Sequence, residues 1–120
     1  MAERRPERVA HLVQAELAGL FLRGTNDPRL HGVTVTAVRM SPDLRVARVY
    51  VRTLADESAR PDVLRALGRA ATFLRSEVGR ALGLRVAPEL RFEWDTTPDT
   101  ARRVDDLLRS ARTRDQDDKT

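Results

Sequence analysis

The longest regular hydrophobic pattern in the chain runs over 61–82 and predicts an amphipathic helix. Its apolar residues recur at gaps of three and four, which is the period of a single helical face. They are Val63, Leu64, Leu67, Ala70, Ala71, Leu74, Val78, Ala81 and Leu82. After Pro88 the period changes to two over 90–94, and that alternation predicts a half-buried strand that follows the helix.

The residues in the middle of this helix do not decide whether the helix is straight or bent. Gly68 and Gly79 each cost about 1 kcal/mol relative to alanine inside a helix. Between them, Ala70, Ala71 and Thr72 combine small side chains with a hydroxyl that can hydrogen-bond to the preceding turn, so a bend can form here. The pattern alone allows one straight helix or a helix bent at these three residues.

Two further helices are predicted near the ends of the chain. The first covers 6–23, because Pro6 suits a first helical position and Gly24 is placed to end the helix. The second begins near Thr97, which can cap it, and the residues that follow form a thin apolar stripe. The stripe of the first helix consists of Val9, Leu12, Val13, Leu17, Leu20 and Phe21.

A hairpin of strands at 33–40 and 45–53 is predicted after the first helix. Pro42 in the connecting SPDL sequence takes the second position of the turn, where proline is favoured. Alternation in the second strand separates a core face from a face suited to water or a ligand. The core face holds Ala47, Val49 and Val51, and the other face holds Arg48, Tyr50 and Arg52.

The predicted order of elements describes one domain. Helix, strand, strand, long helix, strand and short helix form a two-layer α+β sandwich, with a three-stranded sheet covered by helices on one face. A length of 120 residues suits a single domain. We expect the domain to cover 6–110, after a flexible N-terminus at 1–5 and before a disordered tail at 111–120 that lacks apolar residues able to pack.

Composition favours a cytoplasmic protein with a polyanionic partner. The absence of cysteine excludes disulfides and thiolate metal sites, and no apolar run approaches the length of a membrane span. The N-terminus shows no secretory signal. The net charge is +4, and Lys119 is the only lysine among 22 basic residues. Arginine forms forked hydrogen bonds to phosphate and stacks on bases, which lysine does less well.

Catalytic chemistry is not indicated. The chain has no HExxH sequence and no GxxxxGK phosphate loop, and His11 and His31 belong to different elements. Asp95 and Asp99 are explained by a turn and a helix start. We therefore expect no enzyme activity, no metal and no cofactor.

RNA binding is the chemistry that the residues support best. The polar face of the long helix presents cations and hydroxyls along one line, which suits a phosphate backbone. An ordinary solvated helix face is the alternative. The residues of that line are Arg65, Arg69, Thr72, Ser76 and Arg80; Arg75 and Arg85 lie nearby, and Arg45 and Arg48 belong to the locally basic hairpin.

The order of elements is that of a type II KH domain. KH domains usually clamp RNA with a GxxG loop. No two of the six glycines in this chain are three positions apart, so that loop is absent. Any contact with RNA must come from other residues.

Four segments of the chain resemble the ribosome-binding factor A family of bacteria. They are RPERVAHLVQAELAGLFLR near the start, NDPRL at 26–30, VTVTAVRMSPDLRVARVYV at 33–51 and FLRSEVGRALGLRVAPELRFEWD at 73–95. The resemblance implies a KH-like fold in which a helix-kink-helix replaces the GxxG loop. The kink would fall at Ala70, Ala71 and Thr72, where Thr72 stands in place of a family glycine, and the bent helix is therefore favoured.

The resemblance also implies a function. A member of this family would be a monomeric, non-catalytic factor that binds the immature small ribosomal subunit and its rRNA, assists late maturation and processing of 16S-type rRNA, and supports growth in the cold. Its release by a GTPase would follow. The alternative is a KH-like protein-interaction module that uses the open sheet face or the last helix.

Overall fold

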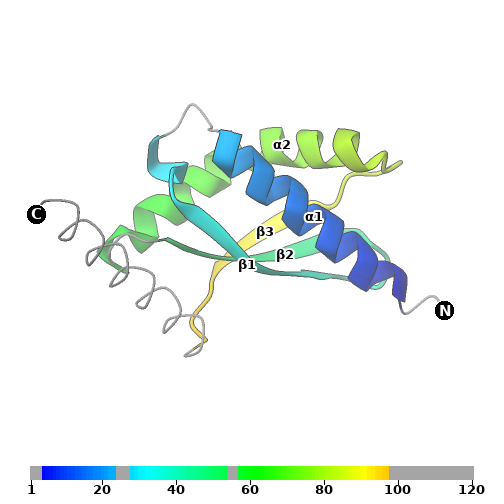
Figure 1. Ribbon diagram of the computed structural model, residues 1–120, viewed down its shortest axis with the longest axis horizontal. Coiled ribbons are helices and arrows are strands. Elements are labelled where there is room, and N and C mark those ends of the chain that lie inside the picture. The colour runs from blue at the N-terminus through cyan, green and yellow to red at the C-terminus, as the bar shows by residue number, and fades with distance from the viewer. Residues whose placement is uncertain (1–3, 24–27, 54–56, 98–120) are drawn as a thin grey trace, which may run out of the picture.

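The computed structural model describes residues 4–23, 28–53 and 57–97 (Figure 1). Its elements follow the predicted order through the third strand. They are α1 (Arg4–Arg23), the 3-10 turn η1 (Pro28–Leu30), β1 (Val33–Met40), β2 (Val46–Thr53), the 3-10 turn η2 (Glu57–Ala59), α2 (Arg60–Leu82) and β3 (Glu89–Trp94). The short helix predicted after Thr97 and the predicted tail at 111–120 lie outside the described residues.

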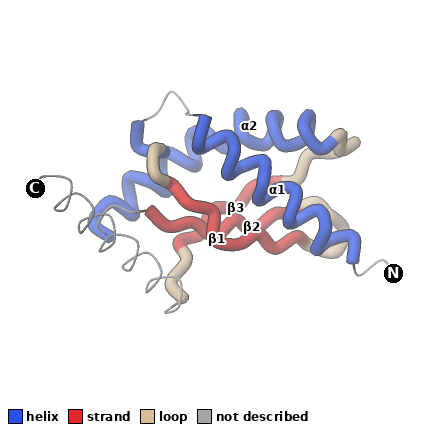
Figure 2. Tube along the Cα trace, viewed as in Figure 1, coloured by secondary structure: helices blue, strands red, loops and turns tan. Residues whose placement is uncertain are grey.

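The three strands form one sheet in the order β1-β2-β3 (Figure 2). β1 and β2 are antiparallel, as the predicted hairpin requires, and β2 and β3 are parallel. A parallel pair needs a long crossover, and α2 supplies it. α1 packs on β1, α2 packs on β3, and the two helices contact each other. The predicted two-layer α+β architecture is confirmed.

The hairpin turn is built from its own side chains. Leu44 N–H donates to the Ser41 carbonyl at 2.9 Å, which closes the predicted turn. Asp43 accepts hydrogen bonds from the Ser41 hydroxyl at 2.6 Å and from the Arg45 backbone N–H at 3.1 Å. Chiefly through the Ser41 hydrogen bond, these contacts hold the pKa of the Asp43 carboxyl below its ordinary value.

The core lies between the helices and one face of the sheet. Ala47, Val49 and Val51 are fully buried, as the alternation in β2 predicts. Most of the predicted α1 stripe is buried too, but Leu12 is 52% exposed, so its place on the buried stripe is wrong. Leu12 lies about 100° around the helix from Val13, at the edge of the stripe, and therefore points away from the sheet.

A β-bulge in β1 changes which side chains face the core. The register with β2 shifts between Val35 and Ala37, so Thr36 is an extra residue. Val35 packs in the core before the bulge, and Val38 and Met40 pack against it afterwards. Because the phase changes by one residue at the bulge, simple alternation does not hold along β1.

α2 is a continuous α-helix of 23 residues. Pro61 lies in its first turn, and Gly83 ends it in the left-handed conformation, with φ 62°. Leu84 N–H donates to the Gly79 carbonyl and Gly83 N–H to the Arg80 carbonyl, which is the Schellman pattern. In Figure 1 the green first half and the yellow-green second half of α2 have different inclinations. The placement of a kink at 70–72 stays a prediction.

Gly79 permits the loop after α2 to pack against the helix. A Cβ atom at this position would lie 2.8 Å from the Ala87 Cβ, closer than carbon atoms approach. At Gly68 an added Cβ would meet nothing within 4 Å. The helix therefore needs glycine at one of the two positions and not at the other.

Candidate nucleic-acid interface

The outer side of α2 carries five polar residues that are all exposed. We call Arg65, Arg69, Thr72, Ser76 and Arg80 the α2 cationic face. The opposite side of the helix is buried in the core, which fixes the rotation of α2 and keeps this face in solvent. The structure thus brings together on one surface five of the nine residues predicted to bind RNA.

Two arginines of the α2 cationic face form ion pairs in water. Arg65 Nη2 lies 2.8 Å from Asp62 Oδ1, and Arg80 Nη1 lies 3.5 Å from Glu77 Oε1. The two arginine side chains are 70% and 75% exposed. Pairs this exposed contribute only about 0–1 kcal/mol, so a phosphate can replace the carboxylate at little cost. Arg69 has no ion pair with any residue that the structure describes.

An exposed aromatic ring lies at the edge of the α2 cationic face. Phe73 is 54% exposed and follows Arg69 by one helical turn. An exposed ring beside a cation can stack on a nucleic-acid base while arginines hold the backbone. Sequence reasoning missed Phe73, although a signal was present: it is the one large apolar residue of α2 that falls outside the apolar stripe.

Arg75 and Arg85 have different surroundings. The Arg75 guanidinium donates to the Ala87 carbonyl through Nε at 3.1 Å and through Nη2 at 2.9 Å. This forked contact ties the loop before β3 to α2, so Arg75 has a structural role in addition to the predicted RNA contact. Arg85 is exposed in that loop.

Arg45 and Arg48 belong to the hairpin and not to α2. Arg48 is exposed on the face of β2 opposite to the buried Ala47 and Val49. Arg45 is exposed where the hairpin enters β2, and its carbonyl accepts from Glu89 N–H at 2.8 Å. α2 packs on the core side of the sheet, so the structure does not bring Arg48 together with the α2 cationic face.

Arg52 does not face solvent, which corrects its predicted place on the open face of β2. Its exposure is 7%. Its Nη1 donates to the Asp95 carbonyl at 2.9 Å and lies 3.3 Å from Glu57 Oε1, while its guanidinium stands 5.5 Å from the centre of the Trp94 ring. Arg52 therefore joins the ends of β2 and β3. Asp95 also accepts from the Thr36 hydroxyl at 2.5 Å, which links the β1 bulge to the same point.

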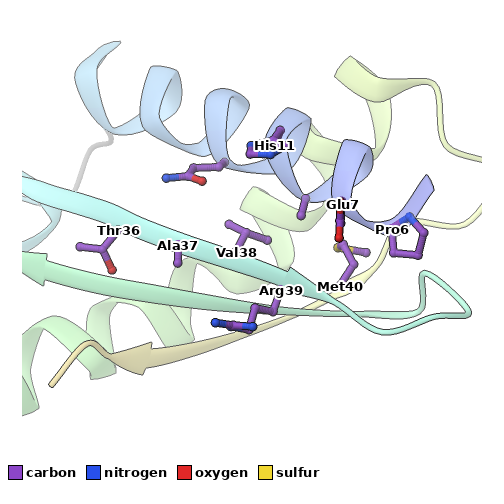
Figure 3. A pocket seen from close by; sticks show the side chains of 10 residues that line it. Pro6, Glu7, His11, Thr36, Ala37, Val38, Arg39 and Met40 are labelled. Carbon is purple, nitrogen blue, oxygen red and sulfur yellow. The ribbon is translucent and has the colours of Figure 1, made fainter. Parts of the chain in front are cut away.

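A groove of about 380 Å³ runs between α1 and β1 (Figure 3). Figure 3 shows Glu7 and His11 of α1 above Val38, Arg39 and Met40 of β1. His11 is exposed on α1. The titratable side chains that line the groove are Glu7, His11 and Arg39.

Neither a metal centre nor a membrane span is found in the described part of the chain. Within residues 4–23, 28–53 and 57–97, no three histidine, aspartate or glutamate side chains gather where they could bind a metal ion. Across the same ranges, every helix is too short or too polar to cross a bilayer.

Comparison with known proteins identifies the family. The family model described as ribosome-binding factor A matches residues 5–108. Ribosome-binding factor A of Anaeromyxobacter dehalogenans strain 2CP-C is 49% identical over 114 residues, which cover 94% of this chain and 83% of the relative. That of Geobacter sulfurreducens is 38% identical over 109 residues, covering 91% and 92%.

Solved structures agree with the sequence match. The crystal structure of ribosome-binding factor A from Thermus thermophilus superposes with a TM-score of 0.63 at 34% identity, covering 73% of this chain and 93% of that one. A Thermus thermophilus homology model of the factor, fitted into a cryo-electron microscopy map of a 30S–RbfA complex, gives a TM-score of 0.60 at 38% identity, with 74% and 98% covered. The chain belongs to the ribosome-binding factor A family, and its fold is the KH-like fold of that family.

Proposed function

We propose that this protein is a non-catalytic assembly factor that binds the small ribosomal subunit through its rRNA. The observation that carries the proposal is the α2 cationic face, which is exposed along its length in a chain of the ribosome-binding factor A family. A relative with the same fold has been fitted into a 30S–RbfA complex, which supports the same partner here. The protein would act as a monomer in the cytoplasm.

The contacts suggest how the face works. Arg65, Arg69 and Arg80 offer charge and forked donors to phosphates, and the Thr72 and Ser76 hydroxyls offer further hydrogen bonds. Such contacts position RNA without reading its sequence. Specificity then comes from the shape of the folded RNA and from stacking against Phe73, which lies on α2 beside Thr72.

Binding of this kind assists maturation by shifting an equilibrium. A protein that binds one conformation of rRNA better than another raises the population of the first, and no covalent step is needed. We propose that the favoured conformation is one that forms late in the maturation and processing of 16S-type rRNA. The factor then leaves the mature subunit. The family resemblance implies that a GTPase releases it.

Co-sedimentation tests the proposal. The purified protein is centrifuged with free small subunits and, separately, with intact ribosomes, at low and at moderate salt. We expect the protein to sediment with free small subunits, to bind intact ribosomes less, and to dissociate as salt rises, since binding through several phosphates falls steeply with salt. Equal recovery with both particles contradicts a role in assembly. Binding that does not weaken as the salt concentration rises supports the alternative function, a protein-interaction module.

A further inference from the structure

Three arginines form a row across the face of the sheet opposite to the helices. Arg39 of β1 is directly opposite Arg48 of β2, and Arg48 is in register with Arg91 of β3. Residues opposite each other on neighbouring strands share a face, and strands lie about 4.8 Å apart. The row therefore gathers three guanidinium groups within roughly 10 Å of sheet. We call it the sheet arginine row.

All three side chains of the row are exposed, and Arg91 is the member that forms an ion pair with a described residue. Arg91 Nη2 lies 3.2 Å from Glu89 Oε2, and both of those side chains are more than half exposed. Within the described part of the chain neither Arg39 nor Arg48 has an ion pair. Glu93, two residues along β3 from Arg91, is a second acid on this face. The row keeps a positive excess after both acids are counted.

The row is unfavourable in the isolated protein. Like charges that lie directly opposite each other on neighbouring strands destabilise a sheet. Arg48 experiences this twice, from Arg39 and from Arg91. A bound anion would offset that repulsion. Relief of the repulsion therefore favours the anion-bound form of the protein.

The surface beside the row has room for such an anion. A hollow of about 370 Å³ is lined by all three arginines together with Met40, Ser41 and Val46. Planar guanidinium groups bind phosphate through paired N–H donors, and several of them around one hollow suit consecutive phosphates of a backbone. The described lining of the hollow has no aromatic side chain for a base, so it suits the backbone alone.

We propose that the sheet arginine row is a second phosphate-backbone site for RNA, separate from the α2 cationic face. The inference rests on the proposed function and extends it. The α2 cationic face belongs to the helical layer, whereas the row lies on the opposite side of the sheet layer. One short RNA segment cannot reach both surfaces. The protein would therefore lie between two segments of folded rRNA and hold them at a fixed separation.

A pair of charge-matched variants tests the row. Arg39→Gln/Arg48→Gln removes two positive charges from the row, and Arg5→Gln/Arg8→Gln removes two exposed charges from α1. Affinity for free small subunits is measured over a range of salt. Relative to the control, the row variant should reduce the slope of log K against log salt by about 1.4–1.8, since each phosphate contact contributes about 0.7–0.9. An equal slope in the two variants overturns the proposal.

Thermal unfolding keeps this test interpretable. Since the row variant removes a repulsion, its melting temperature should equal or exceed that of the control. A lower melting temperature would show that Arg39 and Arg48 stabilise the sheet, and would overturn the reasoning that the row is kept for a ligand.

Directed cleavage tests the two-sided placement. The chain has no cysteine, so Glu93→Cys on the sheet face or Gly68→Cys, exposed next to Arg69 on α2, can each carry a single tethered iron chelate. We expect cleavage of small-subunit rRNA in two separate segments from the two positions. Cleavage of one common segment, or none from position 93, overturns the second site. If the unmodified protein fails to bind small subunits at all, the proposed function itself fails.

Discussion

The contact between Gly79 and Ala87 supports the most quantitative prediction. Replacing Gly68 or Gly79 by alanine gives each variant the same gain in helix propensity, about 1 kcal/mol. At Gly68 the new methyl group meets nothing within 4 Å, so that gain should appear in full. At Gly79 the new Cβ would lie 2.8 Å from the Ala87 Cβ, and overpacking of this kind costs about 1–3 kcal/mol.

The difference between the two variants isolates this contact. Since the propensity gain is common to both, Gly79→Ala should be less stable than Gly68→Ala by about 1–3 kcal/mol. Urea unfolding followed by the fluorescence of Trp94, the only tryptophan and 5% exposed, measures both free energies of unfolding. Adding Ala87→Gly to Gly79→Ala should recover part of the loss as a coupling energy. Equal stability of Gly68→Ala and Gly79→Ala would refute the packing of the loop on α2.

Three further predictions concern single side chains. Leu74→Ala should lower the free energy of unfolding by about 2–5 kcal/mol, because Leu74 is fully buried, whereas Leu22→Ala, at a side chain 88% exposed, should change it by less than about 0.5 kcal/mol in the same urea titration. Phe73→Ala should leave stability nearly unchanged and weaken RNA binding by about 1–3 kcal/mol, which fluorescence anisotropy measures; unchanged affinity would exclude stacking. The pKa of the Asp43 carboxyl is lowered in the folded state, so its stabilising effect is present at neutral pH and is lost as the pH falls through that lowered pKa. Ser41→Ala should raise this pKa in a carboxyl NMR titration, and no change would exclude the Ser41 hydrogen bond as its cause.

The fold followed from the sequence where the physics is local. The three-four spacing in α2 and the alternation in β3 assign the buried and exposed sides directly. In a regular helix or strand, the position of a residue in the repeat determines the face on which its side chain lies. The SPDL sequence predicted its turn because the preference of proline for the second turn position is also a local property. The α2 cationic face could be read from the sequence because it depends only on the helical period.

Features that depend on distant parts of the chain could not be predicted. The bulge at Thr36 depends on the register of β1 against β2, and the burial of Arg52 depends on Asp95 and Trp94 at the end of β3. The sheet arginine row needs the register of all three strands. Periodicity assigns a residue to a face, but it does not show what lies beside that residue in the next strand.

Salt dependence of binding tests the central claim most directly. The affinity of the unmodified protein for free small subunits is compared with that of Arg65→Gln/Arg69→Gln/Arg80→Gln. The control is Arg5→Gln/Arg8→Gln/Arg23→Gln, which removes three exposed arginines of α1 that belong to neither proposed RNA site. If the α2 cationic face holds RNA phosphates, the slope of log K against log salt should fall by about 2–3 in the first variant alone. Parallel salt dependences for that variant and the unmodified protein would contradict the account.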